Sequence, residues 1–517
     1  MAVDLVVHPD VVLDDAALRR AAAREAKVRE ADVARVVVRR RAIDARRGKV
    51  RLRLTVDLRM VGDPPVHDAT PSPLALPSLG APEVVVVGAG PAGLFCAWRL
   101  AQRGIGSVIV DRGKPVRARR HDLAALTKRG QLDPDSNYCY GEGGAGTFSD
   151  GKLYTRAKKR GATSDVLAAF VAYGAPADIL VDARPHIGTN RLPRVIGGMR
   201  DHMESAGVQV RFSARVQSLQ TKQGRVTGVV LADGERIDAR AVVLATGHSA
   251  TDVHRFVVAA GGRLTAKAFA LGVRVEHPQA WIDAQQFGTF AGHPALGAAA
   301  YRLVQNVGEV SCFSFCMCPG GFICPAATEP GGQVVNGWSP HARGGRFANS
   351  GFVTEIGPPQ LRAFGLDPDD VFAGVTLQRA LEAAAFEAGG GGYVGPAQRL
   401  TDFVAGRAST DLPSCSYPRG VAPARVDELL QSLYAPLRTA LRAIDAKMPG
   451  FVGEEAVAVA VESRTSSPIR IDRDREDLQS PGLPGLFPCG EGAGFAGGIM
   501  SAALDGIAIA DAIAMRP

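Results

Sequence analysis

The chain has few cysteines, eight among 517 residues, and no long apolar run. Four of the cysteines fall between positions 312 and 324, which is unlike the spread framework of a small disulfide-stapled secreted protein. No uninterrupted stretch of about 18 apolar residues is present, so a membrane-spanning helix is not expected. The first ten residues lack the basic and apolar regions of a signal peptide. These absences predict a soluble protein of a reducing compartment, the cytoplasm, with no membrane partner.

The overall composition is that of a folded protein. Charged residues make up 22% and hydrophobic residues 46%, which excludes a disordered chain. The length predicts about three folding units, each large enough for its own core. Glycine is plentiful at 60 residues, without the period of collagen. Abundant glycine suits tight turns and the close approach of backbone to a ligand.

The excess positive charge is concentrated near the N-terminus. Residues 1–60 contain 15 Lys or Arg and 9 Asp or Glu, which gives +6 of the net charge of +8. Arg39–Arg41 and Arg46–Arg47 are candidates for a nucleic-acid contact. Interleaved acidic residues and the lack of aromatic residues favour a solvated face instead, so nucleic acid is not the expected partner.

The first 78 residues predict a small domain and a linker. We expect a strand at 3–8, a helix at 14–27, and strands at 33–39 and 49–58. This βαββ order resembles a small ferredoxin-like domain. Residues 62–73 are rich in proline and predict an extended linker or an ordered arm.

A βαβ unit follows at residues 83–111. Its first strand, 84–87, is continuously apolar, as a buried parallel sheet requires, and the sequence Gly88-Ala-Gly90-Pro-Ala-Gly93 leads from it into a helix at 91–103. Gly88 makes the tight turn, Gly90 admits a pyrophosphate, and Gly93 allows the helix to pack closely on the strand. The phosphates would lie at the positive end of the helix. Asp111, after the second strand, is expected to accept hydrogen bonds from a ribose.

Later segments complete this pattern. Residues 208–216 are expected to begin an antiparallel meander that ends in the strand 241–245 and Gly247, and Gly485–Glu491 precedes a helix of small residues. The arrangement resembles the glutathione-reductase-type flavoprotein fold. That resemblance implies FAD, with Glu491 at the ribityl chain or pyrophosphate. Residues 138–153 contain five glycines, and their N–H groups predict an anion nest, to which Lys152 and two hydroxyls add donors.

The resemblance becomes narrower in the motifs Gly247–Asp252, Gly272–Gln279, Ser314–Gly321, Thr465–Ile471 and Gly490–Gly494. Together they resemble a bacterial family of uncharacterised FAD-dependent dehydrogenases, over nearly the whole chain. The implied fold class is α/β, with a Rossmann-like FAD-binding domain of the glutathione-reductase or fumarate-reductase-like type. We place its two parts at residues 79–254 and 455–517, an α+β substrate domain at 255–454, and the small βαββ domain with its linker at 1–78.

The predicted cofactor-binding residues come from the βαβ unit, the glycine-rich loop, the end of the meander and the C-terminal segment. They are Gly88, Gly90, Pro91, Ala92, Gly93, Asp111, Arg112, Gly144, Ala145, Gly146, Thr147, Ser149, Gly151, Val216, Ala245, Thr246, Gly247, Gly490, Glu491, Gly497, Gly498 and Ile499. The predicted catalytic residues are Arg464 and Lys152. A cation such as Arg464 near N1 and C2=O of the flavin stabilises the anionic reduced form. An ion-paired or surface arginine is the alternative, and no role is assigned to His248 or His277.

The clustered cysteines leave several interpretations open. Thiolates are suitable ligands for zinc or an iron–sulfur cluster, but the spacing of Cys312, Cys316, Cys318 and Cys324 lacks a C-x2-C pair, so no metal is expected. Cys316 and Cys318 lie inside a family motif. They are either redox-active or substrate-contacting thiols, or inert and partly buried ones.

The expected function is that of a FAD-dependent oxidoreductase that transfers hydride between an organic substrate and flavin N5. Saturation or desaturation of a C–C bond is the first expectation, by analogy of fold. A second strand, G-x-G-x-x-G turn and helix is missing, so electrons would come from the substrate, a transiently bound NAD(P)H or a redox protein. Alternatives are an RNA-modifying flavoprotein that grips RNA with its basic N-terminal domain, and a flavin-bearing scaffold without turnover. The oligomeric state stays open.

Overall fold

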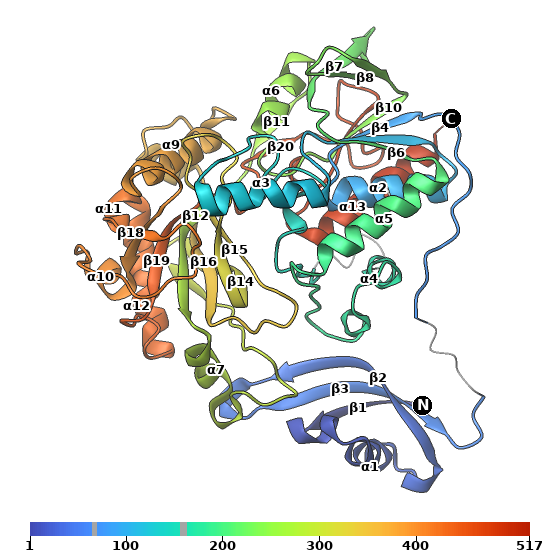
Figure 1. The fold of residues 1–517 in the computed structure, drawn as a ribbon, viewed down its shortest axis with the longest axis vertical. Coiled ribbons are helices and arrows are strands. Elements are labelled where there is room, and N and C mark those ends of the chain that lie inside the picture. Colours follow the sequence, from blue (N-terminus) through green and yellow to red (C-terminus); the bar gives the residue numbers. More distant parts are fainter. Residues whose placement is uncertain (65–69, 156–162, 517) are drawn as a thin grey trace.

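The computed structural model describes residues 1–64, 70–155 and 163–516 and shows a mixed α/β protein (Figure 1). A small sheet near the N-terminus lies at one end of the molecule, below two larger regions. One of these is built on a parallel sheet and the other on a large, mostly antiparallel sheet. Residues 65–69, part of the predicted proline-rich linker, lie outside the described residues.

The N-terminal region has the expected order of strand, helix, strand, strand. Its elements are β1 (Ala2–Val7), η1 (Pro9–Leu13), α1 (Asp15–Ala26), η2 (Glu30–Asp32), β2 (Val33–Asp44), η3 (Arg46–Gly48) and β3 (Arg51–Met60). The sheet is antiparallel in the order β1-β3-β2, and Leu18 and Ala22 of α1 share its core. Helix α1 begins after Asp14 because this side chain accepts hydrogen bonds from two N–H groups of the first turn.

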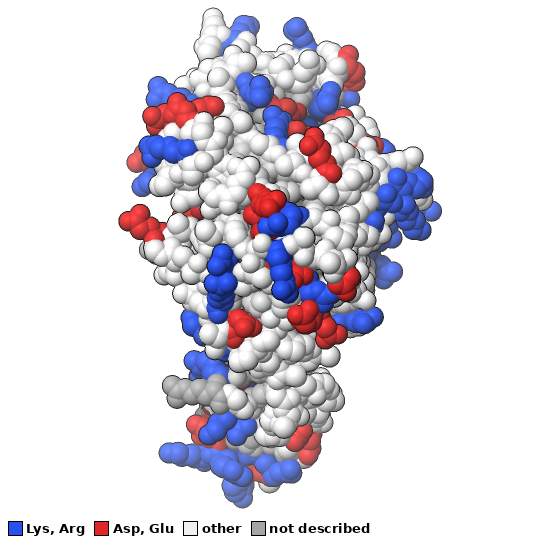
Figure 2. Space-filling view, turned by 90° about the vertical axis from the view of Figure 1, so that its left-hand side faces the viewer, with Lys and Arg blue, Asp and Glu red and all other residues white. Residues whose placement is uncertain are grey.

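Basic side chains of this region pair with carboxylates. Arg39 Nε donates to Asp57 at 2.7 Å, and Arg41 Nε donates to Asp182 of the parallel-sheet region at 2.8 Å. The side chain of Arg47 lies outside the described residues. Both basic and acidic side chains occur on the face shown in Figure 2, and basic ones gather at its right-hand edge and lower end. The absence of a nucleic-acid partner stays a prediction, and this pairing favours it.

A five-stranded sheet forms the centre of the second region. Its strands are β4 (Val84–Val87), β5 (Ser107–Val110), β6 (Gln209–Arg211), β10 (Ala241–Leu244) and β21 (Leu486–Pro488), parallel to one another in the order β21-β10-β4-β5-β6. Helix α2 (Pro91–Gln102) connects β4 with β5 and packs on α13 (Ile499–Ala514), as Figure 1 shows. The predicted βαβ unit is therefore confirmed.

The prediction that residues 208–212 begin the meander is wrong. They form β6, which pairs parallel with β5 at the edge of the sheet. Helix α5 (Leu192–Ala206) brings the chain back along the sheet before β6, so that the two strands run in the same direction. The antiparallel meander consists of β7 (Val216–Lys222), β8 (Arg225–Leu231) and β9 (Arg236–Asp238).

The third region is built on an eight-stranded sheet. Its strands are β12 (Phe269–Pro278), β13 (Val304–Val307), β14 (Val310–Pro325), β15 (Val335–Trp338), β16 (Phe347–Ile356), β17 (Gly395–Arg399), β18 (Val421–Pro423) and β19 (Val457–Glu462). The order is β13-β14-β16-β12-β19-β17-β18, with β15 paired to β14. Strand β19 lies in this sheet although it follows the expected boundary at residue 455. The chain thus leaves the sheet after β19 and not before it.

The helical segment at residues 426–447 is interrupted. It is divided into α11 (Val426–Leu429), η8 (Gln431–Leu433) and α12 (Tyr434–Lys447). Gln431 has a φ of +50°, a left-handed conformation that a continuous right-handed helix cannot contain.

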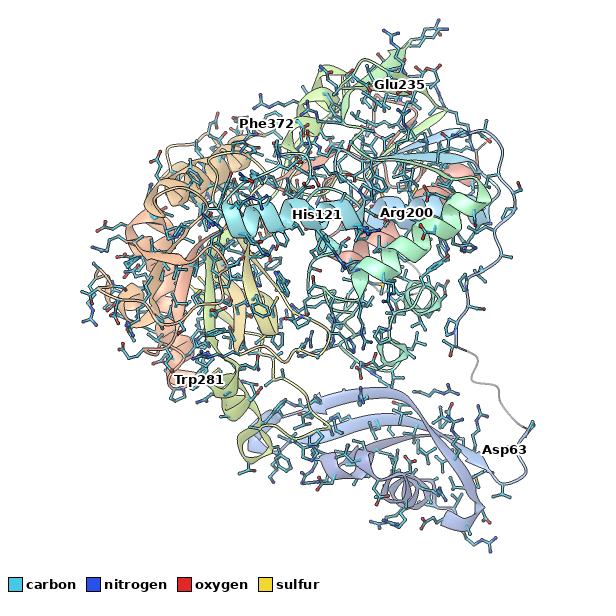
Figure 3. All side chains as sticks on the ribbon, viewed as in Figure 1. Asp63, His121, Arg200, Glu235, Trp281 and Phe372 are labelled. Atoms are coloured by element: carbon cyan, nitrogen blue, oxygen red, sulfur yellow. The ribbon has the colours of Figure 1, made fainter. Side chains whose placement is uncertain are left out.

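The three regions contact one another, and further helices and short strands surround the sheets. They are α3 (Val116–Arg129), η4 (Gly144–Gly146), α4 (Thr163–Ala172), η6 (Ala177–Leu180), α6 (Thr251–Ala259), β11 (Leu264–Ala266), α7 (Gln279–Phe287), η7 (Gly288–Phe290), α8 (Pro358–Ala363), α9 (Ala373–Ala388), α10 (Leu400–Ala405) and β20 (Ile469–Ile471). Trp281 of α7 lies at the end of the third region that approaches the N-terminal sheet (Figure 3). His293 there contacts Asp10 at 2.8 Å. Within the described ranges, no helix is both long and apolar enough to cross a membrane.

Candidate functional site

A cavity of about 370 Å³ brings together segments that are far apart in the sequence. Its wall is formed by the parallel-sheet region on one side and by β14 and β15 on the other. Most of the predicted site residues line it: Gly88, Gly90, Pro91, Ala92, Asp111, Arg112, Gly144, Ala145, Gly146, Ser149, Gly151, Lys152, Val216, Ala245, Thr246, Gly247, Arg464, Glu491, Gly497, Gly498 and Ile499.

The other three predicted residues lie behind this wall. A Cβ on Gly93 would be 1.9 Å from the carbonyl oxygen of Gly88, so Gly93 sits in the close contact between α2 and the turn. Thr147 Oγ1 donates to the carbonyl oxygen of Glu142 at 2.8 Å. The N–H of Gly490 donates to Asp505 at 2.8 Å. These residues shape the backbone around the cavity.

The first glycine-rich turn leaves open space at the start of α2. Gly88 has a φ of +106°, and a Cβ there would be 2.4 Å from the carbonyl oxygen of Ala245. At Gly90 the nearest atom to an added Cβ is the Cα of Gly144, at 3.9 Å. The cavity therefore extends to the N-terminus of α2, where N–H groups and the helix dipole favour a phosphate. These residues fit the pyrophosphate of FAD.

Asp111 holds the turn in place. Its side chain is 7% exposed, and its two oxygens accept hydrogen bonds from the N–H groups of Ala89 and Gly113, each at 2.8 Å. Each carboxylate oxygen has a second lone pair, so a ribose contact is compatible with these bonds and stays a prediction. Beside it, the guanidinium of Arg112 lies 4.6 Å from the centre of the Tyr140 ring.

The second glycine-rich loop is anchored by a buried carboxylate. Glu142 Oε2 accepts a hydrogen bond from the N–H of Val116 at 2.6 Å and lies 3.3 Å from Nη1 of Arg200 on α5, which Figure 3 labels. Burial raises the pKa of Glu142, while the bond from Val116 and the charge of Arg200 act in the opposite direction. The anchor fixes the loop whose later residues, Gly144–Gly146, line the cavity.

Arg464 lines the cavity as a paired residue. It is 3% exposed, and its Nε and Nη2 donate to the two carboxylate oxygens of Glu382, both at 2.7 Å. Burial alone would lower the pKa of Arg464, but the charge of Glu382 raises it. Its buried Nη1 has no hydrogen-bond partner within the described parts of the chain. The ion-paired alternative for Arg464 is thus present, and an arginine already matched by a carboxylate supports an anionic flavin less than a free one.

Lys152 projects toward two thiols. Its Nζ lies 3.6 Å from Sγ of Cys316, 3.8 Å from Sγ of Cys318 and 3.5 Å from Oδ2 of Asp150. Burial would lower the pKa of Lys152, but these three groups raise it. Lys152 therefore carries a positively charged ammonium group, and its side chain is 35% exposed.

The remaining cavity residues lie outside the predicted cofactor-binding and catalytic sets, although the sequence analysis discusses three of them, Cys316, Cys324 and His248. These remaining residues are Val87, Val110, Tyr138, Cys139, Tyr140, Phe148, Asp150, Tyr154, Ala214, His248, Ser249, Val253, Phe315, Cys316, Cys324, Ala326, Asn336, Gly337, Thr465 and Ala502. Several lie in motifs that the sequence analysis already quotes, such as Gly247–Asp252 and Ser314–Gly321, so the motifs themselves were the available signal.

Two further residues that line the cavity, His248 and Glu491, also have shifted pKa values. Burial and the charge of Arg464 lower the pKa of His248 to about 4, so its imidazole is neutral near pH 7. Burial raises the pKa of Glu491 to about 7, against the opposing charge of Lys267. His277, by contrast, is buried and faces the carbonyl oxygen of Phe451 at 2.8 Å, as a core histidine does.

The four clustered cysteines do not converge. Cys312 pairs with Thr354 in the ladder between β14 and β16, whereas Cys316 and Cys324 line the cavity. Over residues 1–64, 70–155 and 163–516, no three His, Cys, Asp or Glu side chains are grouped to hold a metal ion.

Sequence models of flavoprotein families match three segments of the chain. The family described as FAD-dependent protein, C-terminal domain-like, matches residues 268–465, the FAD dependent oxidoreductase family matches 185–294, and the FAD binding domain matches 81–122. A domain of unknown function matches residues 2–59. FAD is therefore the cofactor, and the protein is an oxidoreductase.

The matches to solved structures have low sequence identity and low TM-scores. The crystal structure of FqzB is 15% identical, with coverage of 86% of this chain and 78% of that chain and a TM-score of 0.37. The flavin-dependent brominase Bmp2 is 12% identical, with coverage of 84% and 79% and a TM-score of 0.38. Similarity this distant does not bear on the reaction of this chain.

A much nearer relative is an uncharacterized protein of Clostridium beijerinckii. It is 40% identical over 434 residues, which cover 83% of this chain and 80% of the relative. The match spans most of both proteins, and the family models that match this chain are those of FAD-dependent enzymes. The chain therefore belongs to the same family as the Clostridium protein, a family of uncharacterised FAD-dependent oxidoreductases.

Proposed function

We propose that the protein transfers hydride between a small organic substrate and flavin N5 in this cavity, and that the reaction saturates or desaturates a C–C bond. The observation that carries the proposal is the shared wall of the cavity. Residues predicted to bind FAD line one side, and Phe315, Asn336 and Gly337 of the eight-stranded sheet line the other. A substrate between the two would lie against the bound flavin and away from bulk water.

In this proposal the turn from Gly88 to Gly93 and Asp111 hold the ADP half of FAD, and Gly144–Gly146 with Glu491 hold the flavin half. Bound FAD supplies the hydride acceptor or donor. The Lys152 ammonium, on a side chain that is partly exposed in the cavity, binds an electron-rich oxygen of the substrate and orients it. The unpaired Nη1 of Arg464 donates a hydrogen bond toward the flavin edge.

The source of electrons is part of the same proposal. Within the described residues, the five-stranded sheet is the one parallel sheet with more than two strands, so a separate nicotinamide-binding unit of that kind is not seen there. We propose that the substrate itself, a transiently bound NAD(P)H or a redox protein supplies the electrons. The domain limits 1–78, 79–254, 255–454 and 455–517 belong to the proposal, with β19 serving the substrate side. We also propose that the protein is located in the cytoplasm.

The test is an anaerobic reduction screen of the holoprotein. Unsaturated and saturated carbonyl compounds, NADH and NADPH are mixed with it, and the absorbance of oxidised flavin is followed. We expect one organic donor to bleach the wild-type flavin and to need a higher concentration with Lys152→Met. The matched control, Lys49→Met, removes an exposed lysine of the N-terminal region and should behave as wild type.

Two outcomes contradict the proposal. One is incorporation of an oxygen atom from isotopically labelled O₂ into the product of a parallel aerobic reaction, which makes the reaction an oxygenation. The other is a product formed at equal rates by wild type and Lys152→Met at every substrate concentration, which removes Lys152 from substrate binding.

A further inference from the structure

Two cysteines meet at the wall of the flavin cavity. Cys316 lines the cavity, and Cys318, which is 0% exposed, lies directly behind it. Cys318 Sγ donates to the carbonyl oxygen of Cys316 at 3.2 Å. Lys152 Nζ is within 4 Å of both sulfur atoms. A dithiol with a cation beside it is thus built into the site.

The backbone at Cys316 departs from a regular strand. Its φ is +47°, in the left-handed region, and the register between β14 and β16 shifts between Phe315 and Cys318. Such a conformation costs energy in a residue with a Cβ and persists where the surrounding structure enforces it, often at functional sites. A bulge of this kind redirects side chains, and here it accompanies the turn of Cys316 toward the cavity.

The charges around the pair favour a thiolate at Cys316. Lys152 faces both thiols, and Arg274 Nη2 lies 3.5 Å from Sγ of Cys318 while its Nη1 donates to Glu462 at 2.8 Å. The bond from Cys318, Lys152 and Arg274 together lower the pKa of Cys316, against the opposing effect of burial. The contact with Cys316 and burial raise the pKa of Cys318. These contacts favour ionisation of Cys316 over Cys318, the arrangement of a nucleophile and its resolving partner.

The charged groups near the pair come from several elements. They are Lys152 and Asp150 of the glycine-rich loop, Arg343 beside Asp150, Arg274 of β12, Glu462 of β19 and Glu491 of the C-terminal segment. Three are cations and three are carboxyl groups. Burial raises the pKa values of Glu462 and Glu491 to about 7, so these two are only partly ionised near neutrality. A thiolate at Cys316 balances the remaining positive charge.

Cys316 also lies near the place where the flavin is expected. Its charge contributes to the raised pKa of Glu491, and both residues line the same cavity. Glu491 is the residue predicted at the flavin half of FAD.

We propose that Cys316 and Cys318 form a redox-active pair that exchanges two electrons with the flavin and passes them to a small external disulfide. This goes beyond hydride transfer from an organic donor and rests on the proposed function only through the flavin's position in the cavity.

The two steps balance. Reduced flavin gives two electrons to the Cys316–Cys318 disulfide, whose S–S bond breaks. Of the two protons that the flavin loses, one stays on Cys318 and one is released, because Cys316 remains a thiolate. The Cys316 thiolate then attacks the external disulfide and expels one thiolate, which takes up the released proton. Cys318 attacks the resulting mixed disulfide and gives its proton to the second leaving sulfur, so that a second thiol leaves and the internal disulfide forms again.

The first test counts electrons. Air-oxidised holoprotein is titrated anaerobically with dithionite, which replaces any organic donor. We expect wild type to take up two more electrons per FAD than Cys316→Ser or Cys318→Ser, and peptide mapping of the oxidised protein to show a Cys316–Cys318 linkage. The control Cys312→Ser changes a buried cysteine of the same strand outside the cavity wall and should match wild type.

The second test follows the flow of electrons to a disulfide. Dithionite-reduced holoprotein is mixed anaerobically with hydroxyethyl disulfide. We expect the flavin of wild type and Cys312→Ser to be reoxidised at least tenfold faster than that of Cys316→Ser or Cys318→Ser.

A third measurement needs no turnover and examines Lys152. Iodoacetamide alkylation of Cys316 in the reduced apoprotein, read by mass spectrometry, should reach half its maximal rate below the usual thiol pKa of about 8.5. In Lys152→Gln this midpoint should move to higher pH, whereas Lys49→Gln should leave it unchanged.

Equal electron counts in wild type and Cys318→Ser, with no linkage in the oxidised protein, overturn the proposal. Equal reoxidation rates in these two proteins also overturn it. Because dithionite supplies the electrons, these results do not depend on whether the hydride transfer proposed above occurs.

Discussion

Replacing Gly90 with alanine separates cofactor binding from folding. Gly90 has φ −75° and ψ −178°, a conformation open to any residue, and the nearest atom to an added Cβ is 3.9 Å away. Alanine lowers the entropy of the unfolded chain but is a poorer N-cap, and these effects of about 1 kcal/mol or less oppose each other. The apoprotein should therefore keep its stability. The methyl group instead occupies the space at the start of α2 that the pyrophosphate needs.

Gly93→Ala is the matched contrast. Its Cβ would lie 1.9 Å from the carbonyl oxygen of Gly88, so helix and turn must move apart. Overpacking of this kind costs about 1–3 kcal/mol, and each kcal/mol corresponds to roughly 2–4 °C in melting temperature for a unit of 150–250 residues.

The assay measures melting of the apoprotein and FAD affinity on reconstitution. We expect Gly90→Ala to melt as wild type and to bind FAD at least about tenfold more weakly, which corresponds to about 1.4 kcal/mol. Gly93→Ala should melt at lower temperature with or without FAD. Unchanged FAD affinity in Gly90→Ala would refute the placement of the pyrophosphate at this turn.

Three further changes test other parts of the site. Arg464→Ala leaves Glu382 buried without its partner and should cost about 3–5 kcal/mol of stability. Glu382→Gln instead frees the cation and should raise the flavin reduction potential, measured by an anaerobic dye titration. Equal potentials in Glu382→Gln and wild type would remove Arg464 from the flavin edge. Asp111→Asn keeps one acceptor for two N–H groups and should increase FAD dissociation measured by fluorescence, and an unchanged rate would limit Asp111 to a minor role. In the folded state the pKa of Glu491 is raised from 4.5 to about 7, so the folded protein binds this proton more tightly and its stability falls as the pH rises between these values. The melting temperature of apo Glu491→Gln should therefore increase relative to that of wild type as the pH rises through this range. A difference that does not depend on pH would contradict the shift.

Local signals account for what the sequence could predict. The strand 84–87, the turn with its spaced glycines and the helix that begins at Pro91 lie within a short stretch, and the structure shows each of them at the expected place. Most of the predicted cofactor residues that follow β4, β5, β10 and β21 share one cavity because they lie at the ends of neighbouring parallel strands, a consequence of the sheet order. The assignment of each residue to a part of FAD stays a prediction.

The features that could not be predicted from the sequence, such as the positions of β6 and β19, depend on pairing between distant segments. Residues 209–211 have the same local pattern whether they pair with β5 or begin a meander, and only the crossover through α5 decides between them. The same holds for β19, which lies between β12 and β17 although the chain next returns to the parallel sheet.

The charged residues show this limit most directly. Arg464 and Glu382 are 82 positions apart, and Lys152 and Cys316 are 164 positions apart, so no local pattern joins either pair. For Arg464 the partner is a carboxylate, which matches its charge before any ligand binds. For Lys152 the partners include two thiols, one of which its charge helps to ionise. In the proposal above the reactive group at this cavity is the Cys316 thiolate, which the charge of Lys152 favours, so a chemical probe of thiols tests the site more sharply than the loss of either cation alone.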